Sequence, residues 1–471
     1  MVLRETWGGF ATSMHPITQV DNILILVIHF YPMDQKDDKG ARNNVIRSLV
    51  QYLNAINEEK FVPGKTWIKY AGRVFDNEEY TLLMDAVLDG WITAGRFAEE
   101  FEFQLSRYLG IYSSSLVNSG SSANLIALSS LTSPALGEDR LKKGEEVITV
   151  AAGFPTTVNP IIQNGLIPVF LDIQEGTYNI NPELIEDAIS DKTRAIMVAH
   201  TLGNPFDLDS IMKIARYHNL YLIEDNCDAL GSEYGEKKTG TFGHISTLSF
   251  YPAHHITMGE GGAVNTNDPV LERIIRSFRD WGRDCYCEPG ASNTCGMRFT
   301  QKFGDLPLGY DHKYVYSHIG YNMKVTDLQA AIGVAQLKKI GLFVEKRRHN
   351  FRYLYERLKE FEYVFDLPIA LKKSNPSWFA FPLTVRKDAP FGRNEIVSFL
   401  EEKKIMTRPI FAGNLIRHPA YLGIEKRIGS ELSITDKIMN NSFFIGVYPG
   451  ISDEMLDYVG DKFEEFLRGH K

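Results

Sequence analysis

The 471-residue sequence lacks the features that mark several classes of protein. The longest apolar run near the N-terminus, residues 23–28, is far shorter than the roughly 20 residues that cross a bilayer. No basic start followed by a small-residue cleavage site is present, so we predict no signal peptide. Repeats, low-complexity tracts and coiled-coil heptads are also missing. We therefore expect a cytoplasmic globular protein that does not enter a membrane.

The chain also lacks an excess of positive charge. Its formal net charge is −8, which argues against nonspecific binding to nucleic acid. A hydrophobic fraction of 44% and a charged fraction of 23% are ordinary for a soluble protein with a sizeable core. The length suggests two or three domains, or one large α/β domain with an appendage.

Cysteine is scarce, and its placement is uneven. The chain has four cysteines, Cys227, Cys285, Cys287 and Cys295, and the last three fall within eleven residues. In a large cytosolic chain such residues are more often metal ligands or inert thiols than disulfides. Thiolates hold zinc or iron–sulfur clusters, and a C-x-C with distant partners fits the usual zinc pattern poorly. The spacing therefore favours a metal or cluster site.

Short β-rich runs alternate with helical stretches in the middle of the chain. This alternation predicts βαβ units and a mostly parallel sheet rich in Ile, Val and Leu. We expect an extension at 1–58, a large α/β domain at 59–345 with an irregular loop at 282–316, and a smaller α/β domain at 346–471. The expected strands are 146–150, 168–172, 195–200, 220–224, 245–251 and 263–265, and the expected helices among them are 156–163, 182–189 and 210–218.

Several polar or aromatic residues follow these strands, where ligands gather in such sheets. Asp225 ends one strand, and Phe154 and Asn204 follow two others. The turn at 118–121 feeds an apolar helix, and free amides at a helix N-terminus can hold a phosphate. Arg408, in a break of the C-terminal pattern, is a candidate ligand for a nucleotide diphosphate, although a solvated surface arginine fits that position as well.

The most informative stretch is 249–262, which reads Ser-Phe-Tyr-Pro-Ala-His-His-Ile-Thr-Met-Gly-Glu-Gly-Gly. It resembles the cofactor-lysine segment of the DegT/DnrJ/EryC1/StrS sugar aminotransferases and dehydrases, which are fold-type I vitamin B6 enzymes. In that family the sixth position carries the lysine that binds pyridoxal phosphate covalently. His254 stands there in this chain. A histidine cannot form that bond but can exchange protons near neutral pH, as in the small subfamily of sugar 3-dehydrases.

The resemblance implies a role for each candidate residue. His254 is the catalytic base, and the cofactor is pyridoxamine 5′-phosphate, related to pyridoxal 5′-phosphate. Asp225 pairs with the pyridine nitrogen, which keeps the ring an electron sink. Asn322 is expected to cross the interface of a homodimer to the neighbour's phosphate. The other implied cofactor-binding residues are Gly120 and Ser121 at the phosphate, Phe154 on the ring face, Asn204 at the ring hydroxyl, and Ser249.

The four cysteines resemble the ligands of a [2Fe–2S] cluster in the iron–sulfur member of that subfamily. That likeness implies removal of the C3 hydroxyl from a nucleotide-linked, CDP-type 4-keto-6-deoxyhexose, with electrons from an NADH-dependent flavin iron–sulfur reductase. The four thiolates could close around two irons only if the 282–316 loop folds back toward Cys227. Three alternatives stay open, namely a cluster-free dehydrase that uses glutamate, a sugar aminotransferase and a noncatalytic metal-binding regulator.

Overall fold

The computed structural model describes residues 35–56, 60–287 and 292–470 of the chain. It divides into two compact units, residues 1–48 and 49–471. The helix α1 (Gln35–Ala55) begins in the first unit, and the rest of this description concerns the second. The apolar run at 23–28 lies outside the described residues. Among the described helices, none is long and apolar enough to cross a membrane.

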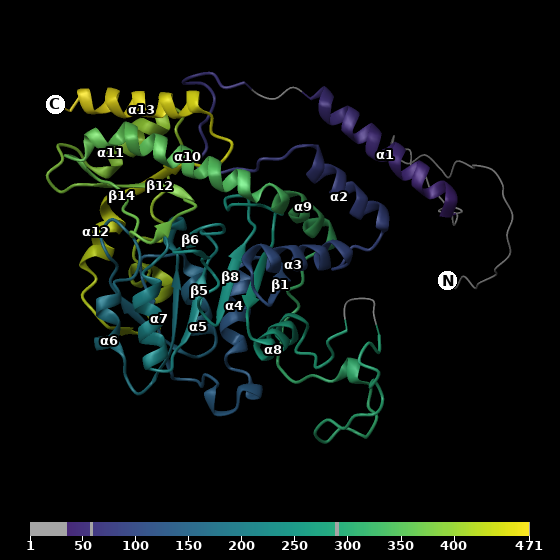
Figure 1. The fold of residues 1–471 in the computed structure, drawn as a ribbon. Helices are drawn as coiled ribbons and strands as arrows, with labels where there is room; N and C mark the ends of the chain where they lie inside the picture. Colours follow the sequence, from purple (N-terminus) through teal and green to yellow (C-terminus); the bar gives the residue numbers. More distant parts are fainter. Residues whose placement is uncertain (1–34, 57–59, 288–291, 471) are drawn as a thin grey trace, which may run out of the picture. The chain divides into compact units, whose positions relative to one another are not determined.

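An eight-stranded sheet forms the centre of the second unit (Figure 1). Its order is β1-β9-β8-β5-β4-β2-β3-β13, and all pairs from β8 to β13 are parallel. Strand β9 runs antiparallel to both of its neighbours. The strands are β1 (Ser113–Val117), β2 (Glu146–Val150), β3 (Ile167–Leu171), β4 (Thr193–Ala199), β5 (Tyr221–Asp225), β8 (Ile245–Ser249), β9 (Gly262–Thr266) and β13 (Arg427–Ile428).

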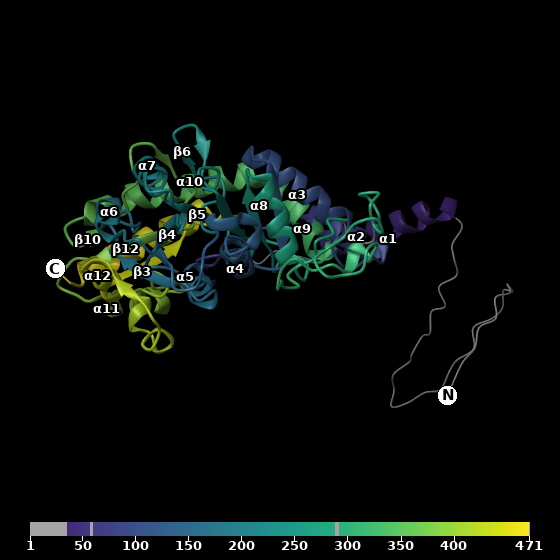
Figure 2. The same cartoon turned by 90° about the horizontal axis from the view of Figure 1, so that it is seen from below.

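Helices cover both faces of this sheet, so its strands are buried on both sides. In β4, Ala195 and Met197 face one apolar cluster, whereas Ile196 and Val198 face the other. The first cluster includes α4 (Gly120–Ser130), α5 (Pro155–Gln163) and α8 (Pro269–Arg279). The second includes α6 (Ile185–Ala188) and α7 (Leu208–Tyr217), and Figure 2 shows β3, β4 and β5 between these helices and α5. The predicted mostly parallel sheet is confirmed.

A third cluster covers the β1, β8 and β9 end of the sheet. It is formed by α3 (Arg96–Leu109), α9 (Asp327–Lys338) and residues of α2 (Asn77–Asp89). Asp76 caps α2, accepting a hydrogen bond from the Glu78 amide in a capping box with Glu79. This cluster also holds the segment around Phe250 and Met258. The segment that carries His254 is therefore anchored in the apolar core on both sides, by Phe250 and Met258.

The C-terminal part has its own core around a three-stranded antiparallel sheet, β10-β12-β14. Strand β10 is Phe365–Asp366, β12 is Ala380–Val385 and β14 is Ser442–Gly446. The helices beside them are α10 (Ile340–Leu358), α11 (Arg393–Glu402), α12 (Ser433–Asn441) and α13 (Asp453–Arg468). A small sheet joins β11 (Ser374–Asn375) to β6 (Glu233–Tyr234) and β7 (Lys237–Lys238). The proposed domain boundary at 345–346 stays a prediction.

Candidate active site

The turn between β1 and α4 forms a cradle with free amide groups. Ser119 caps α4 by accepting a hydrogen bond of 3.1 Å from the Ser122 amide. The first amides of a helix have no partner within it, so Gly120 and Ser121 present donors to an anion. A Cβ at Gly120 would lie 2.4 Å from Cβ of Ser249 and 3.2 Å from Sγ of Cys227. Only glycine fits this close approach, and the turn brings the predicted residues Gly120 and Ser249 together.

Asp225 lies at the carboxyl end of β5 and is buried. Its Oδ2 accepts hydrogen bonds of 2.9 Å from Asn124 Nδ2 and 2.6 Å from Thr157 Oγ1. These contacts fix the carboxylate in a dry environment beside the cradle. Such a fixed carboxylate suits a positively charged ring nitrogen.

His254 follows β8 in a tight turn, with its amide bonded to the Tyr251 carbonyl. Its Nδ1 lies 3.5 Å from Oδ1 of Asp228 and has no hydrogen-bond partner among the described residues. Burial lowers the pKa of His254 to about 4, although the nearby charge of Asp225 opposes this shift. A histidine with this pKa is neutral at physiological pH, so one of its two ring nitrogens keeps a lone pair that can accept a proton.

Asp228 is a site residue that the sequence analysis missed. It is buried, and its Oδ2 accepts a bond of 3.3 Å from the Leu202 amide. Burial and then the charge of Asp225 raise the pKa of Asp228 to about 8. The signal available in the sequence was its position three residues after Asp225, on the turn that leaves β5.

Aromatic rings connect the two sides of the site. The His254 ring lies 5.5 Å from Phe379, which lies 6.2 Å from Phe411, and Phe411 lies 6.0 Å from Phe154. Phe154 is 52% exposed, so it is not packed in the core and its ring face can meet a ligand. The backbone supports this arrangement, since the Ala412 amide bonds to the Gly153 carbonyl at 3.2 Å. Phe379 and Phe411 come from distant parts of the chain, and the sequence analysis did not find them.

Three predicted residues have other contacts in this structure. Asn204 is fully buried and donates both amide hydrogens, to the carbonyls of Thr177 and Ile369, so only its Oδ1 is left to accept a bond. The Arg408 guanidinium lies 4.5 Å from the Tyr70 ring, with its side chain 45% exposed. Asn322 accepts a bond of 3.0 Å from Lys324 Nζ. Their proposed ligand contacts stay predictions.

The four cysteines do not come together within the chain. Cys227 lies at the cradle, where burial and the charges of Asp225 and Asp228 raise the pKa of its thiol. Cys285 and Cys287 are neighbours, and Cys295 Sγ lies 3.8 Å from His312 Nδ1. Within 35–56, 60–287 and 292–470, no three His, Cys, Asp or Glu side chains gather in a geometry that could hold a metal ion. The expected folding back of the 282–316 loop is not the arrangement seen here.

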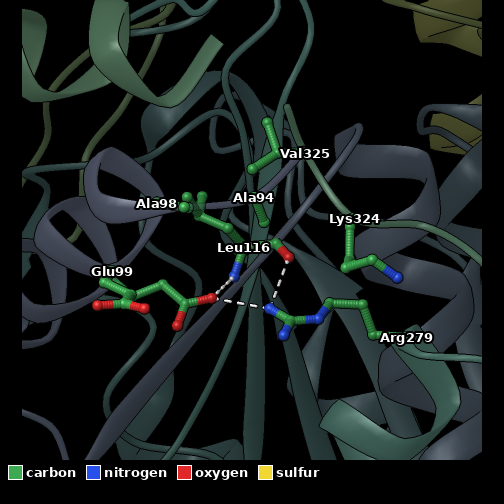
Figure 3. Close-up of a pocket in the computed structure, with 9 residues that line it drawn as sticks. Ala94, Ala98, Glu99, Leu116, Arg279, Lys324 and Val325 are labelled. Carbon is green, nitrogen blue, oxygen red and sulfur yellow. Dashed lines mark hydrogen bonds and ion pairs between the residues drawn. The ribbon is translucent and has the colours of Figure 1, made fainter. Parts of the chain in front are cut away.

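A tightly bonded neck holds this loop at its two ends. The Ser317 amide bonds to the Gly282 carbonyl at 2.8 Å, and a Cβ at Gly282 would lie 1.9 Å from the His318 oxygen. Next to the neck, Arg279 donates to the Leu116 carbonyl at 3.1 Å and to Glu102 at 2.8 Å (Figure 3). Lys324 pairs with Asp280 at 2.9 Å. The neck is therefore attached to β1 and α3 near the cradle.

Comparisons with known proteins agree with this geometry. A family model described as the DegT/DnrJ/EryC1/StrS aminotransferase family matches residues 74–464. The lipopolysaccharide biosynthesis protein RfbH of Salmonella typhimurium is 56% identical over 429 residues, covering 91% of this chain and 98% of that protein. The dTDP-4-dehydro-2,6-dideoxy-D-glucose 3-dehydratase of Saccharopolyspora spinosa is 52% identical over 427 residues, which cover 91% of this chain and 92% of that protein.

The fold also matches solved structures. The E. coli GDP-4-keto-6-deoxy-D-mannose-3-dehydratase with bound hydrated PLP has a TM-score of 0.76 at 29% identity, covering 84% of this chain and 99% of that one. The predicted fold-type I architecture is thus confirmed. Since the family model spans most of the sequence and two relatives are more than half identical over 91% of it, this protein belongs to the DegT/DnrJ/EryC1/StrS aminotransferase family.

Proposed function

We propose that this protein is a sugar 3-dehydratase that removes the C3 hydroxyl group of a nucleotide-linked 4-keto-6-deoxyhexose. The observation that carries the proposal is His254, a neutral base whose side chain is only 16% exposed, at the position of the family's lysine. The names of two relatives support it, one a sugar 3-dehydratase and the other a lipopolysaccharide biosynthesis protein. We take CDP as the first nucleotide to test, as in the CDP-6-deoxy-L-threo-D-glycero-4-hexulose 3-dehydrase of 3,6-dideoxyhexose biosynthesis for O-antigens.

The site has the features that pyridoxamine 5′-phosphate needs. The α4 cradle at Gly120 and Ser121 offers amides to the phosphate, with Ser249 beside them. Asp225 offers a buried carboxylate to the nitrogen of the cofactor ring. The exposed ring of Phe154 can stack on the face of that cofactor ring. When bound, this cofactor supplies an amine that condenses with the C4 ketone and a ring that accepts electrons.

The protein's own part is to move a proton. When the proton of the neutral His254 ring is on Nδ1, facing Asp228, its Nε2 keeps a lone pair and is the atom that accepts a proton. Asp225 keeps the site negative near the ring nitrogen. The aromatic side chains of Phe154, Phe379 and Phe411 form an apolar wall on one side of the site.

The overall reaction requires a reductant. Replacing C3–OH by C3–H releases water and consumes two electrons and two protons. We propose that these electrons come from NADH through a flavin iron–sulfur reductase, and that Cys227, Cys285, Cys287 and Cys295 hold a [2Fe–2S] cluster in a homodimer. In the described residues of one chain, the four cysteines are not arranged as the ligands of one cluster.

One observation favours a second candidate, a cluster-free dehydratase that takes its electrons from glutamate. The cysteines are apart in this chain. A similar structure, at 29% identity with a TM-score of 0.75, is the GDP-4-keto-6-deoxymannose-3-dehydratase with a trapped PLP-glutamate geminal diamine. Both candidates use His254, so the electron donor distinguishes them.

The test supplies the purified protein with CDP-, dTDP- or GDP-linked 4-keto-6-deoxyhexose. In one set of reactions, the protein is first reconstituted anaerobically with iron and then receives NADH and the reductase. In the other set, the protein receives glutamate instead. We expect a product lighter by one oxygen atom in the first set, and none with His254→Asn. Turnover with glutamate alone would select the second candidate. An amino sugar made by the wild-type protein, or full activity of His254→Asn, would overturn the proposal.

The matched variant His254→Lys restores the family's residue. It should bind pyridoxal phosphate covalently, with a visible absorbance band, and lose dehydration. This result would show that the pocket still accepts the cofactor when the base is gone.

A further inference from the structure

The carboxylate of Asp225 lies where side chains from three other elements of the site meet. Asn124 comes from α4, the helix that begins at the cradle, and Thr157 comes from the first turn of α5. Thr247 comes from β8, the strand that leads to the turn of His254. The helix α4 packs against both α5 and β8 (Figure 1). Asp225 is therefore bonded to the elements that carry the cradle and the proposed base.

The two oxygens of this carboxylate are occupied to different extents. Oδ2 accepts bonds of 2.9 Å from Asn124 Nδ2 and 2.6 Å from Thr157 Oγ1, and a carboxylate oxygen has roughly two acceptor positions. Oδ1 accepts a bond of 3.2 Å from the backbone amide of Cys227. The thiol of Cys227 also lies near Asp225, but a thiol is only a weak donor. Oδ1 is therefore the oxygen with a position left for a ring nitrogen.

The hydroxyl group of Thr247 sets the orientation of the Asn124 amide. Thr247 Oγ1 lies 2.6 Å from Asn124 Oδ1 and 3.5 Å from Asp225 Oδ1, so its single hydrogen is donated to the amide oxygen. An ionised carboxylate can only accept, so the amide nitrogen of Asn124 faces Asp225. The bonds thus run in one direction, from Thr247 to Asn124 and from Asn124 to Asp225.

Burial makes this arrangement specific. Asn124, Thr157, Asp225 and Thr247 are all buried, so none of their polar atoms can exchange its partner for bulk water. A buried polar group that loses its partner is costly, and bonds in such a network strengthen one another. Removing the Thr247 hydroxyl would therefore be felt at Asp225, although Thr247 lies one side chain away from the carboxylate.

We propose that Asn124 and Thr247 are positioning residues for the cofactor ring. Thr247 orients the Asn124 amide, and this amide, together with Thr157, turns Oδ1 of Asp225 toward the ring nitrogen. Neither Asn124 nor Thr247 needs to touch the cofactor itself. This inference rests on the proposed function, since the ring nitrogen that it concerns is that of pyridoxamine 5′-phosphate.

The test measures the affinity of the cofactor-free protein for two probes by titration calorimetry. One probe is pyridoxamine 5′-phosphate, and the other is its analogue with C–H in place of the ring nitrogen. The analogue keeps the phosphate and the ring face but cannot bond to Asp225. The wild type should bind pyridoxamine phosphate about tenfold or more tightly than the analogue, as expected for one hydrogen bond to a charged group.

Thr247→Val removes the hydroxyl group and keeps the shape of the side chain. This variant should lose most of the preference for pyridoxamine phosphate while it binds the analogue as the wild type does. Asn124→Leu should lose the preference as well. Thr247→Ser keeps a donor at the same place and should keep the preference. If these residues only held α4 on the sheet, the affinity for both probes would fall equally.

The matched control is Thr149→Val, on β2 of the same sheet. Thr149 is as buried as Thr247, but its hydroxyl bonds to no group among the described residues, so this variant should bind both probes like the wild type. An unchanged preference in Thr247→Val and Asn124→Leu, or an equal loss of affinity for both probes, would overturn the positioning role and leave the proposed function intact. A wild type without any preference would instead overturn the contact between Asp225 and the ring nitrogen.

A spectroscopic measurement gives the same answer without turnover. Pyridoxamine phosphate labelled with ¹⁵N in the ring reports the hydrogen bond of that nitrogen through its chemical shift in solid-state NMR. The resonance should move in Thr247→Val and stay at the wild-type position in Thr247→Ser and Thr149→Val. Coincident resonances in the wild type and Thr247→Val would contradict the inference.

Discussion

The guanidinium group of Arg347 donates a hydrogen bond of 3.0 Å to the carbonyl oxygen of His254. Arg347 lies in α10 and is among the largest fully buried side chains of the described residues. Its other amino group donates to the carbonyls of Trp378 and Phe379 at 3.2 and 3.0 Å. The buried guanidinium of Arg347 thus fixes the backbone of His254, the proposed base, and of Phe379, whose ring lies beside the His254 ring.

Replacing Arg347 by Met should therefore affect both stability and the base. Three buried carbonyls lose a donor, so we expect the free energy of unfolding to fall by about 3 kcal/mol. Proton exchange at the cofactor C4′ should slow as well, because His254 shifts. Denaturant titration and hydrogen–deuterium exchange measure the two effects. The control is Arg348→Met, which removes bonds to Pro376 and Gly231 but none to His254; equal loss of proton exchange in both variants would contradict this role.

The lowered pKa of His254 predicts a specific acid sensitivity. Its folded-state pKa is about 4 and its ordinary value is 6.5, so the unfolded chain takes up a proton first as the pH falls. The stabilisation is complete above pH 6.5 and is lost as the pH falls toward 4. Relative to His254→Asn, the cofactor-free wild type should lose about 3 kcal/mol over this range. Burial also lowers the pKa of His255, but that residue is present in both proteins and its contribution cancels. Parallel stability curves for the two proteins would refute the prediction.

Asp225→Asn should weaken cofactor binding and slow proton exchange by orders of magnitude. The charge-assisted bond to the ring nitrogen is worth about 1.5–3 kcal/mol, which corresponds to a loss of affinity of about tenfold or more. Absorbance titration with pyridoxamine phosphate measures it. Asp172→Asn removes the same charge from a buried site at the end of β3, where it binds the amides of Ile434 and Thr435. The Asp172→Asn control should keep its cofactor affinity. An equal loss of affinity in both variants would contradict a specific bond from Asp225 to the cofactor.

Gly120→Ala tests the close approach of the cradle to Ser249. The added methyl group would lie 2.4 Å from Cβ of Ser249, so the turn must shift. Overpacking of this kind costs about 1–3 kcal/mol, which should lower phosphate-dependent cofactor affinity by about tenfold. Gly341→Ala, where a Cβ meets nothing within 4 Å, is the control and should bind the cofactor normally. Unchanged affinity in Gly120→Ala would show that the phosphate does not lie at this turn.

The sequence predicted the sheet well because its strands are buried on both faces. The predicted strand at 146–150 matches β2, and the run at 263–265 lies within β9. The candidate site positions Gly120, Asp225 and His254 could be proposed from the sequence because each lies in a local motif. Phe379 and Phe411 could not, since their part in the site depends on how distant segments meet, whereas Asp228 was missed although it lies only three residues after Asp225. The cysteines share this limit, because their spacing does not say how the loop residues lie relative to Cys227 in the folded chain.

The close approach of Gly282 and Gly320 at the neck lets the loop vary independently of the central sheet. Because the loop leaves and returns at one point, its residues contribute nothing to the register of the central sheet. An insertion whose ends coincide can be gained, lengthened or lost in a single genetic event without rebuilding the scaffold. The cysteine loop can therefore change in length or sequence while the cradle at Gly120 and the turn at His254 stay in place.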